Sequence, residues 1–196
     1  MVDFNKPKSV IIAGVGGQGA ITVAQLVLGA AWKSGYYVLQ SEVHGMSQRG
    51  GEVNAQIIFD KVPVTSPVVT QGEADLLIGI EPLETLRYLS QMSKDANIIA
   101  SSEPVINMEN YPKIETILEK IKSVEGAVLI DTLKAAKELN NKHAGNICIL
   151  GAASKYLPIA NEVWEAVIRE RFESKGEEVV MSNIKAFQYG KKFTEA

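Results

Sequence analysis

Residues 10–19 read Val-Ile-Ile-Ala-Gly-Val-Gly-Gly-Gln-Gly, and this stretch constrains the fold more than any other. Four apolar residues, three of them β-branched, lead into a glycine-rich turn, and the apolar residues 20–32 follow. This order is typical of a strand, a tight turn and a helix. Glycine has no Cβ, so the backbone can turn sharply and the N–H groups that open the helix can face an anion. Two interpretations follow: a cradle for a phosphate-bearing ligand, or a turn that only packs the helix closely on the strand.

The length and composition predict one globular domain that spans residues 1–196. Hydrophobic residues make up 46% of the chain and charged residues 22%, which are ordinary values for a globular protein. No apolar run reaches the roughly 18 residues that a membrane-spanning helix needs, and the first residues lack the apolar core of a signal peptide. We therefore expect a cytoplasmic protein.

Charge and metal-ligating residues argue against several classes of function. The formal net charge is −3 and the Lys and Arg residues are scattered, so we expect no nucleic acid and no membrane surface as partner. The single cysteine, Cys148, lies in an apolar run and is predicted to be a core residue. One cysteine cannot hold an iron-sulfur cluster or a four-cysteine zinc site, and two histidines argue against a histidine-rich site. We expect no metal bound by this chain alone.

The remaining pattern alternates strands and helices and then becomes helical. The predicted strands after the first are residues 36–40, 53–59, 74–80, 97–101 and 127–130, and the helices between them are residues 20–34, 83–92 and 112–124. Further helices are predicted at 133–139, 144–156, 161–172 and 182–193, with Asn161 as a cap. The first helix is expected to join the first two strands in a right-handed β-α-β unit. The predicted fold class is α/β: a three-layer α/β/α domain with a mostly parallel sheet and a helical C-terminal third.

Residues 41–51, Ser-Glu-Val-His-Gly-Met-Ser-Gln-Arg-Gly-Gly, are predicted to form a polar loop at the carboxyl end of the second strand. At this edge of such sheets ligands bind. Arg49 can hold a phosphate or carboxylate through two parallel N–H bonds, and the N–H groups of Gly50 and Gly51 can face the same anion. His44 can move a proton near neutral pH. Alternatively, His44 and Arg49 are exposed residues on a solvated turn, and Glu42 holds the loop through its backbone N–H groups.

A dinucleotide site is a second interpretation of the first turn. Gly14, Gly16 and Gly19 satisfy the G-x-G-x-x-G fingerprint after a strand, and Glu42 lies about 20 residues further on, where a ribose-binding acid is expected. Two features weaken it. Glu42 falls beyond the predicted end of the second strand, and no hydride-transfer set such as Tyr-x-x-x-Lys follows.

Taken together, the two glycine-rich stretches resemble the gamma-type domain of the 2-oxoacid:ferredoxin oxidoreductases, and within that family the beta subunit of the indolepyruvate enzymes. The resemblance extends to the sequence of residues 81–84, Glu-Pro-Leu-Glu, and to the C-terminal residues Asn183, Ala186, Phe187 and Gly190. In 2-oxoglutarate and pyruvate relatives the second loop tends to read Ser-Tyr-Gly-x-Glu-x-Arg-Gly-Gly. The portion His-Gly-Met-Ser-Gln therefore favours an arylpyruvate enzyme.

The resemblance implies a fold like domain III of pyruvate:ferredoxin oxidoreductase and a subunit that is inactive alone. Family members decarboxylate a 2-oxoacid on thiamine diphosphate, form an acyl-CoA and pass electrons through iron-sulfur clusters to ferredoxin. A larger partner chain would hold thiamine diphosphate, Mg and the clusters, with CoA as co-substrate. Three residues would lie at the subunit junction as tentative catalytic residues: His44, Arg49 and Glu42. Seven would face a phosphate of CoA or of the cofactor, or would pack on the partner: Gly14, Gly16, Gly17, Gln18, Gly19, Gly50 and Gly51.

Three alternatives stay open at this point. The chain is a free-standing NAD(P)-binding protein, a binding module whose glycine turn is only structural, or the equivalent subunit of a 2-oxoglutarate or pyruvate enzyme.

Overall fold

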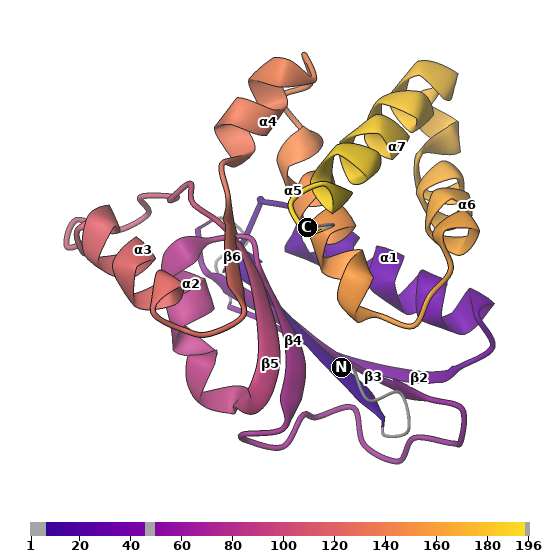
Figure 1. The fold of residues 1–196 in the computed structure, drawn as a ribbon, viewed down its shortest axis with the longest axis horizontal. Coiled ribbons are helices and arrows are strands. Elements are labelled where there is room, and N and C mark those ends of the chain that lie inside the picture. The colour runs from indigo at the N-terminus through magenta and orange to yellow at the C-terminus, as the bar shows by residue number, and fades with distance from the viewer. Residues whose placement is uncertain (1–6, 46–49, 195–196) are drawn as a thin grey trace.

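The computed structural model describes residues 7–45 and 50–194. These residues form a six-stranded sheet with the strand order β2-β3-β1-β4-β5-β6 (Figure 1). The strands are β1 (Lys8–Val15), β2 (Tyr37–His44), β3 (Glu52–Asp60), β4 (Ala74–Gly79), β5 (Met92–Ser101) and β6 (Ala127–Ile130). Strands β1, β4, β5 and β6 lie side by side in this order and pair in parallel. Strand β3 is antiparallel to both of its neighbours, β1 and β2. Five of the six described strands therefore run in one direction, and the prediction of a mostly parallel sheet is confirmed.

Helices cover both faces of this sheet, as Figure 1 shows. One face packs against α1 (Ala20–Lys33), α5 (Ala144–Ala153), α6 (Asn161–Phe172) and α7 (Glu177–Lys191). The other packs against α2 (Pro82–Arg87) and α3 (Ile114–Lys122), and α4 (Thr132–Glu138) follows β6 and packs on α5. Single 3₁₀ turns follow α2, α5 and α6 at Leu89–Gln91, Ser154–Tyr156 and Glu173–Lys175. The three-layer α/β/α fold and the helical C-terminal third are confirmed.

Strand β1 is apolar without alternation because both of its faces are covered. Val10 and Ile12 face α1 and α5, whereas Ile11 and Ala13 face α2 and α3, and all four are fully buried. Burying a side chain such as that of Ile12 contributes roughly 1.5–3 kcal/mol. The central strand thus joins the two hydrophobic cores and fixes the place where the first glycine turn leaves the sheet.

The expected β-α-β unit needs a correction. Strands β1 and β2 run in the same direction, but β3 lies between them and pairs with both. The reason is that β2 and β3 are joined by a short connection, which returns the chain antiparallel beside β2. The apolar residues Val53, Ala55 and Ile57 of β3 are buried against the α1 layer and occupy the position next to β1.

Several predicted boundaries were also wrong. Strand β2 continues to His44 through ladder pairs with β3, so Glu42 and His44 lie in a strand rather than in the predicted loop 41–51. The N-cap of α6 is Ala160; Asn161 is the first helical residue and accepts a hydrogen bond from Lys191 at 3.0 Å. Helix α2 ends at Arg87 instead of 92, and β5 begins at Met92 instead of 97.

Helices α5 and α7 cross with their backbones in direct contact. A Cβ added to Gly190 would lie 1.9 Å from the Cys148 carbonyl oxygen, and one added to Gly151 would lie 2.1 Å from the Phe187 carbonyl oxygen. Only glycine fits at both positions. Nearby, the ring of Phe187 lies 5.8 Å from that of Trp164 and both side chains are fully buried. This crossing gives Phe187 and Gly190 a packing role near the C-terminus.

Candidate functional site

The two glycine-rich turns meet at the carboxyl edge of the sheet. The Gly16 N–H donates to the Gly51 carbonyl oxygen at 2.8 Å, and the Gly50 N–H donates to the Gly16 carbonyl oxygen at 3.2 Å. These bonds continue the ladder between β1 and β3, in which Val15 pairs with Glu52. The two stretches therefore meet at one edge of the sheet. The edge is where ligands bind in open α/β sheets.

Three of these glycines adopt conformations that other residues rarely adopt. The φ angles are 91° at Gly17, 88° at Gly19 and 74° at Gly50, all in the left-handed region. A Cβ added at Gly17 would meet no atom within 4 Å, so backbone conformation rather than space requires glycine there. Gly14 differs, because a Cβ there would lie 3.1 Å from Cβ of Ile80. The contact gives Gly14 a packing role at the end of β1.

Gln18 holds the first turn in place. Its Oε1 accepts a hydrogen bond from the Val15 N–H at 3.0 Å. Its carbonyl oxygen accepts one from Nδ2 of Asn146 on α5 at 2.5 Å. The side chain thus closes the turn on itself, and Asn146 ties the turn to the C-terminal helical layer.

A pocket of about 900 Å³ opens beside the first turn. Gly17, Gln18 and Gly19 line it together with residues of α1, α4, α5 and α7. Both α1 and α5 begin here, and neither has a side-chain cap at its N-cap residue. At the start of α5 the Ala144 N–H donates to the Asn141 carbonyl oxygen at 3.1 Å. The lining also carries polar and charged side chains that sequence reasoning missed: Asn140, Asn141, Lys142, His143, Asn146, Lys175 and the acidic Glu178. Backbone N–H groups and lysines favour an anionic ligand.

The residues of the second loop have different surroundings. Glu42 and His44 are exposed on the edge strand β2, and Glu42 accepts a hydrogen bond from the side chain of Gln40. Among the described residues that line the pocket, neither is included. Arg49 and its neighbours at positions 46–48 lie outside the described residues, so the Arg49 prediction stays a prediction.

The sheet order weighs against a dinucleotide site. In that fold the ribose-binding acid follows a strand that neighbours β1. Here Glu42 lies on β2, and the inserted β3 separates it from β1 by two strand spacings, about 9.6 Å. Glu42 is therefore one strand too far from the glycine turn for the expected role.

Buried acidic residues form a second feature of this edge. Glu81 follows β4 and is 1% exposed, and Glu84 in α2 is 3% exposed. Arg87 Nε lies 3.2 Å from Oε1 and 3.0 Å from Oε2 of Glu84. Burial raises the pKa of the Glu84 carboxyl above its ordinary value of 4.5, Arg87 opposes that shift, and the carboxylates of Glu52 and Glu81 add to it. The sequence signal for this cluster was the stretch 81–84.

Two tyrosines donate hydrogen bonds into this cluster. Tyr88 O–H donates to Oε1 of Glu52, and Tyr111 O–H donates to Oε1 of Glu81. Burial, followed by these bonds to carboxylates, raises the pKa of both phenols. Both tyrosines therefore stay protonated donors at neutral pH.

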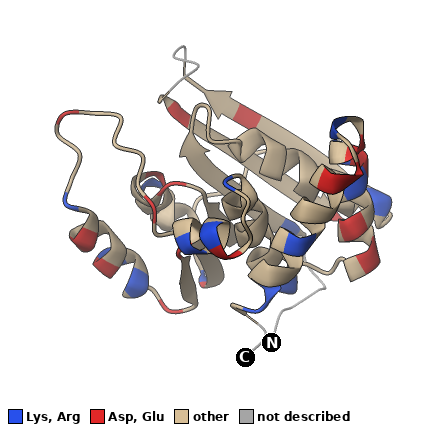
Figure 2. Ribbon diagram, turned by 90° about the horizontal axis from the view of Figure 1, so that it is seen from above, with Lys and Arg blue, Asp and Glu red and all other residues tan. Residues whose placement is uncertain are grey.

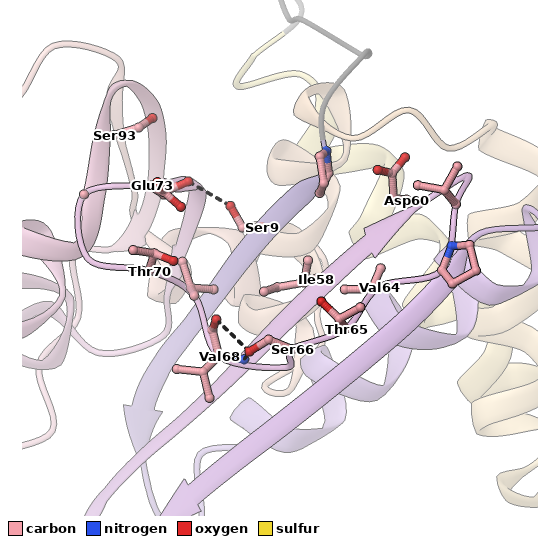
Figure 3. Close-up of a pocket in the computed structure, with 15 residues that line it drawn as sticks. Ser9, Ile58, Asp60, Val64, Thr65, Ser66, Val68, Thr70, Glu73 and Ser93 are labelled. Carbon is pink, nitrogen blue, oxygen red and sulfur yellow. Dashed lines mark hydrogen bonds between the residues drawn. The ribbon is translucent and has the colours of Figure 1, made fainter.

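A second pocket, of about 600 Å³, lies at the opposite edge of the sheet (Figure 3). Residues 62–66 and 68–70 form one wall. On another wall, Ser9 Oγ donates to the Glu73 carbonyl oxygen at 3.0 Å. The amino ends of β1 and β4 lie here, so this pocket is remote from both glycine turns.

Charged groups are distributed over the helices. Figure 2 shows basic and acidic residues interspersed along the outer helices, while the strands are mostly uncharged. Among residues 7–45 and 50–194, no three His, Cys, Asp or Glu side chains gather as a metal site. Within the same ranges no helix is both long and apolar enough to cross a bilayer.

Comparison with known proteins relates this chain to one family. Residues 9–193 match the family described as pyruvate ferredoxin/flavodoxin oxidoreductase. The chain is 35% identical over 197 residues to indolepyruvate oxidoreductase subunit IorB of Pyrococcus horikoshii, covering 95% of this chain and 96% of that one. It is 31% identical over 191 residues to the Archaeoglobus fulgidus IorB, covering 93% and 92%.

Solved structures share the fold. The gamma subunit of a keto/oxoacid ferredoxin oxidoreductase from Geobacter sulfurreducens superposes with a TM-score of 0.69 at 21% identity, covering 95% of this chain and 98% of that one. The 2-oxoglutarate:ferredoxin oxidoreductase of Magnetococcus marinus, with 2-oxoglutarate, coenzyme A and succinyl-CoA bound, gives a TM-score of 0.76 at 21% identity, covering 97% of this chain and 31% of that one.

The expected resemblance is thereby confirmed from residue 9 to residue 193, over both glycine turns, the stretch 81–84 and the C-terminal helices. By this match and the extent of its similarity to the two IorB subunits, the chain belongs to the pyruvate ferredoxin/flavodoxin oxidoreductase family.

Proposed function

We propose that this chain is the non-cluster subunit of a 2-oxoacid:ferredoxin oxidoreductase that acts on arylpyruvates such as indolepyruvate. It would serve as one domain, residues 1–196, in the cytoplasm. A larger partner chain would hold thiamine diphosphate, Mg and iron-sulfur clusters, and the complex would pass electrons to ferredoxin with CoA as co-substrate. On its own the chain would be inactive.

The observation that carries this proposal is the joined pair of glycine turns beside the 900 Å³ pocket. The N–H groups of Gly16 and Gln18 donate to the Gly51 and Val15 carbonyl oxygens, so Gly17 and Gly19 at the start of α1 are the glycines proposed to face the ligand. Lys142 and Lys175 add two positive charges around the same pocket, against one negative charge from Glu178. Phosphate groups of CoA or of thiamine diphosphate are anions that such a lining favours. In this proposal the chain binds and orients a phosphate, while the partner carries out the chemistry.

The cysteine content of this chain fits a proposal in which the partner chain holds the iron-sulfur clusters. A four-thiolate cluster needs four cysteines, and this sequence has one, Cys148, which is fully buried. The clusters would therefore be ligated by the partner, and thiamine diphosphate would supply the carbanion stabilisation there. Support for CoA comes from the Magnetococcus enzyme of the same fold, which is described with CoA and succinyl-CoA bound.

The arylpyruvate substrate is favoured by the sequence of the second loop and by the identity to the two IorB subunits. His44, Glu42 and Arg49 are proposed to lie at the junction with the partner. The exposure of Glu42 and His44 on an edge strand supports that placement, because their side chains are accessible to a second chain.

Co-expression with a cysteine-rich thiamine diphosphate chain encoded beside this one tests the proposal. We expect a stable complex that reduces ferredoxin with indolepyruvate or phenylpyruvate and CoA, faster than with pyruvate or 2-oxoglutarate. Tight NAD(H) binding by the chain alone, or oxidation of a 2-oxoacid without any partner, would contradict it. A preference of the complex for pyruvate or 2-oxoglutarate would change only the proposed substrate and would leave the proposed role as a subunit in place.

Substitutions then test the two parts of the site in the complex. Arg49→Ala is expected to lower turnover strongly without loss of folding. Lys142→Ala combined with Lys175→Ala is expected to raise the KM for CoA, or the concentration of thiamine diphosphate that gives half activity, on the order of tenfold. The matched control is Lys122→Ala on α3, which lies outside the pocket lining.

A further inference from the structure

The stretch Glu81-Pro82-Leu83-Glu84 has no role in the proposed function, yet Glu81 is among the most deeply buried charged residues described. Its carboxylate accepts three hydrogen bonds. Oε2 accepts the Glu84 N–H at 2.8 Å and so caps α2. Oε1 accepts the Val105 N–H at 3.3 Å and the Tyr111 O–H. These three donors offset the cost of burying the charge.

Capping alone does not explain a glutamate at this position. Helix N-caps favour the shorter side chains of Ser, Thr, Asp and Asn. Asp131 illustrates this at α4, where one oxygen accepts the Lys134 N–H at 2.7 Å. Glu81 caps α2 with one oxygen and has a second oxygen directed to another part of the chain. The longer side chain of Glu81 therefore reaches the Val105 N–H and the Tyr111 O–H, which a shorter Asp cap would not reach.

The second oxygen holds the β5–α3 segment, residues 102–113, which contains no helix or strand and is described throughout. Val105 and Tyr111 are its two contacts with Glu81. Between them, residues 106–110 are exposed and bulge outward. Asn107, in this exposed part, donates from Nδ2 to the Gly50 carbonyl oxygen at 2.5 Å. Glu81 thus fixes both ends of the bulge that carries Asn107.

Asn107 continues the connection to the paired glycine turns. Gly50 has a φ of 74°, and its N–H donates to the Gly16 carbonyl oxygen at 3.2 Å. With Asn107 bound to its carbonyl oxygen, Gly50 has both its N–H and its C=O hydrogen-bonded. The contacts therefore run from the buried carboxylate through the β5–α3 segment to the turn of residues 50–51, and from there to the turn after β1.

We propose that Glu81 is a positioning residue: through the β5–α3 segment and Asn107 it sets the place of the Gly50 turn against the turn of residues 14–19. These contacts alone support the positions of the two turns, and a role of Glu81 in catalysis rests on the proposed function. Glu81→Gln disturbs the arrangement because an amide has one acceptor oxygen where three donors converge on two. Asn107→Ala removes only the last contact.

Hydrogen exchange measured by mass spectrometry on the full chain without a partner tests the positions directly. In Glu81→Gln we expect peptides that cover residues 102–111 and 50–53 to exchange on the order of tenfold faster. In Asn107→Ala we expect the change only at 50–53 and in the turn after β1. Asp131→Asn is the matched control: it alters a cap carboxylate that makes no contact of this kind, and both regions should keep their wild-type rates.

The outcomes separate a positioning role from capping. If Glu81→Gln speeds exchange only within α2 and leaves 102–111 and 50–53 unchanged, Glu81 is a cap and the proposal is wrong. If Glu81→Gln does not fold, Tyr111→Phe decides, because it removes one bond to the segment and leaves the cap in place. Unchanged exchange at 102–111 in Tyr111→Phe would then overturn the proposal.

The assembled enzyme gives a second readout. Asn107→Ala is expected to lower kcat/KM on the order of tenfold with an unchanged melting temperature, while Asp131→Asn leaves it unchanged. Faster exchange at 50–53 with wild-type kcat/KM would show that the turn has no catalytic importance and would overturn the role in catalysis. Absence of any 2-oxoacid activity in the wild-type complex would instead reject the proposed function and leave the exchange result standing.

Discussion

At the crossing of α5 and α7, a Cβ on Gly190 would meet a backbone oxygen at 1.9 Å, whereas on Gly17 at the carboxyl edge it would meet no atom within 4 Å. The first glycine is needed because two helices touch. The second is needed because its φ of 91° is rare for residues with a side chain. The same residue type therefore indicates close packing in one region and an unusual backbone conformation with open space around it in the other.

The crossing should be the more fragile of the two regions. Gly190→Ala forces the backbones of α5 and α7 apart, and we expect a loss of at least about 3 kcal/mol in the free energy of unfolding, measured in urea. Gly29→Ala is the matched control, because its Cβ would lie 3.6 Å from Val167 Cγ1 in ordinary contact. That control should be neutral or stabilising by up to about 1 kcal/mol. Equal stability of both variants would refute the close-packing explanation.

Gly17→Ala tests the open region. The side chain has room, so the expected cost is the conformational one of about 1–2 kcal/mol, with the fold intact. Gly35→Ala matches it, with a φ of 81° and no atom within 4 Å. The melting temperature should fall by a similar amount in both variants. Only Gly17→Ala should lower the rate of ferredoxin reduction by the assembled complex. Equal activities would make the first turn a structural feature.

The buried Glu84 at the carboxyl edge should also make the free energy of unfolding depend on pH. Because burial raises the pKa of Glu84, the folded state binds this proton more tightly than the unfolded chain. The resulting stability is present below the ordinary value of 4.5 and is lost as the pH rises through the higher folded pKa. In Glu84→Gln this loss is absent, so the variant should gain stability relative to wild type from acidic to neutral pH. If the difference in free energy of unfolding between Glu84→Gln and the wild type, measured in urea, does not change with pH, the expected gain of the variant is contradicted.

The smallest effect is expected at Cys148, in the core of the crossing. Burial raises the pKa of this thiol to about 12. A thiol reagent at neutral pH should therefore leave the folded chain unlabelled and react only in denaturant. Measurable labelling of Gly190→Ala under native conditions would sharpen the comparison, since it would show that the added methyl group opens the crossing.

Much of the fold was predictable because it depends on local patterns. The apolar run before Gly14, the helical spacing after Thr132 and the strand at residues 127–130 were predicted with the right element types. The course of the second strand was not. Glu42 and His44 are polar, so the sequence suggested a loop, whereas pairing with Ala55 and Val53 of β3 extends the strand to His44.

For the candidate site, the sequence predicted the two glycine turns but not their surroundings. Lys142 and Lys175 lie in polar stretches that contain no recognisable motif. Only the folded structure places both of them around one pocket. Asn107 and Gly50 are 57 positions apart, and Tyr111 and Glu81 are 30 apart. No periodicity within a helix or strand encodes such contacts.

By itself the sequence determined the α/β class, the helical last third, and the presence of two glycine-rich turns where strands end, because these follow from the spacing of apolar residues and from the freedom of glycine. Tertiary structure alone decided that β3 lies between β1 and β2, that Glu42 is held away from the first turn, and that the buried Glu81 connects to Gly50. Strand order and buried hydrogen bonds depend on which distant segments exclude water together, and that is a property of the whole chain.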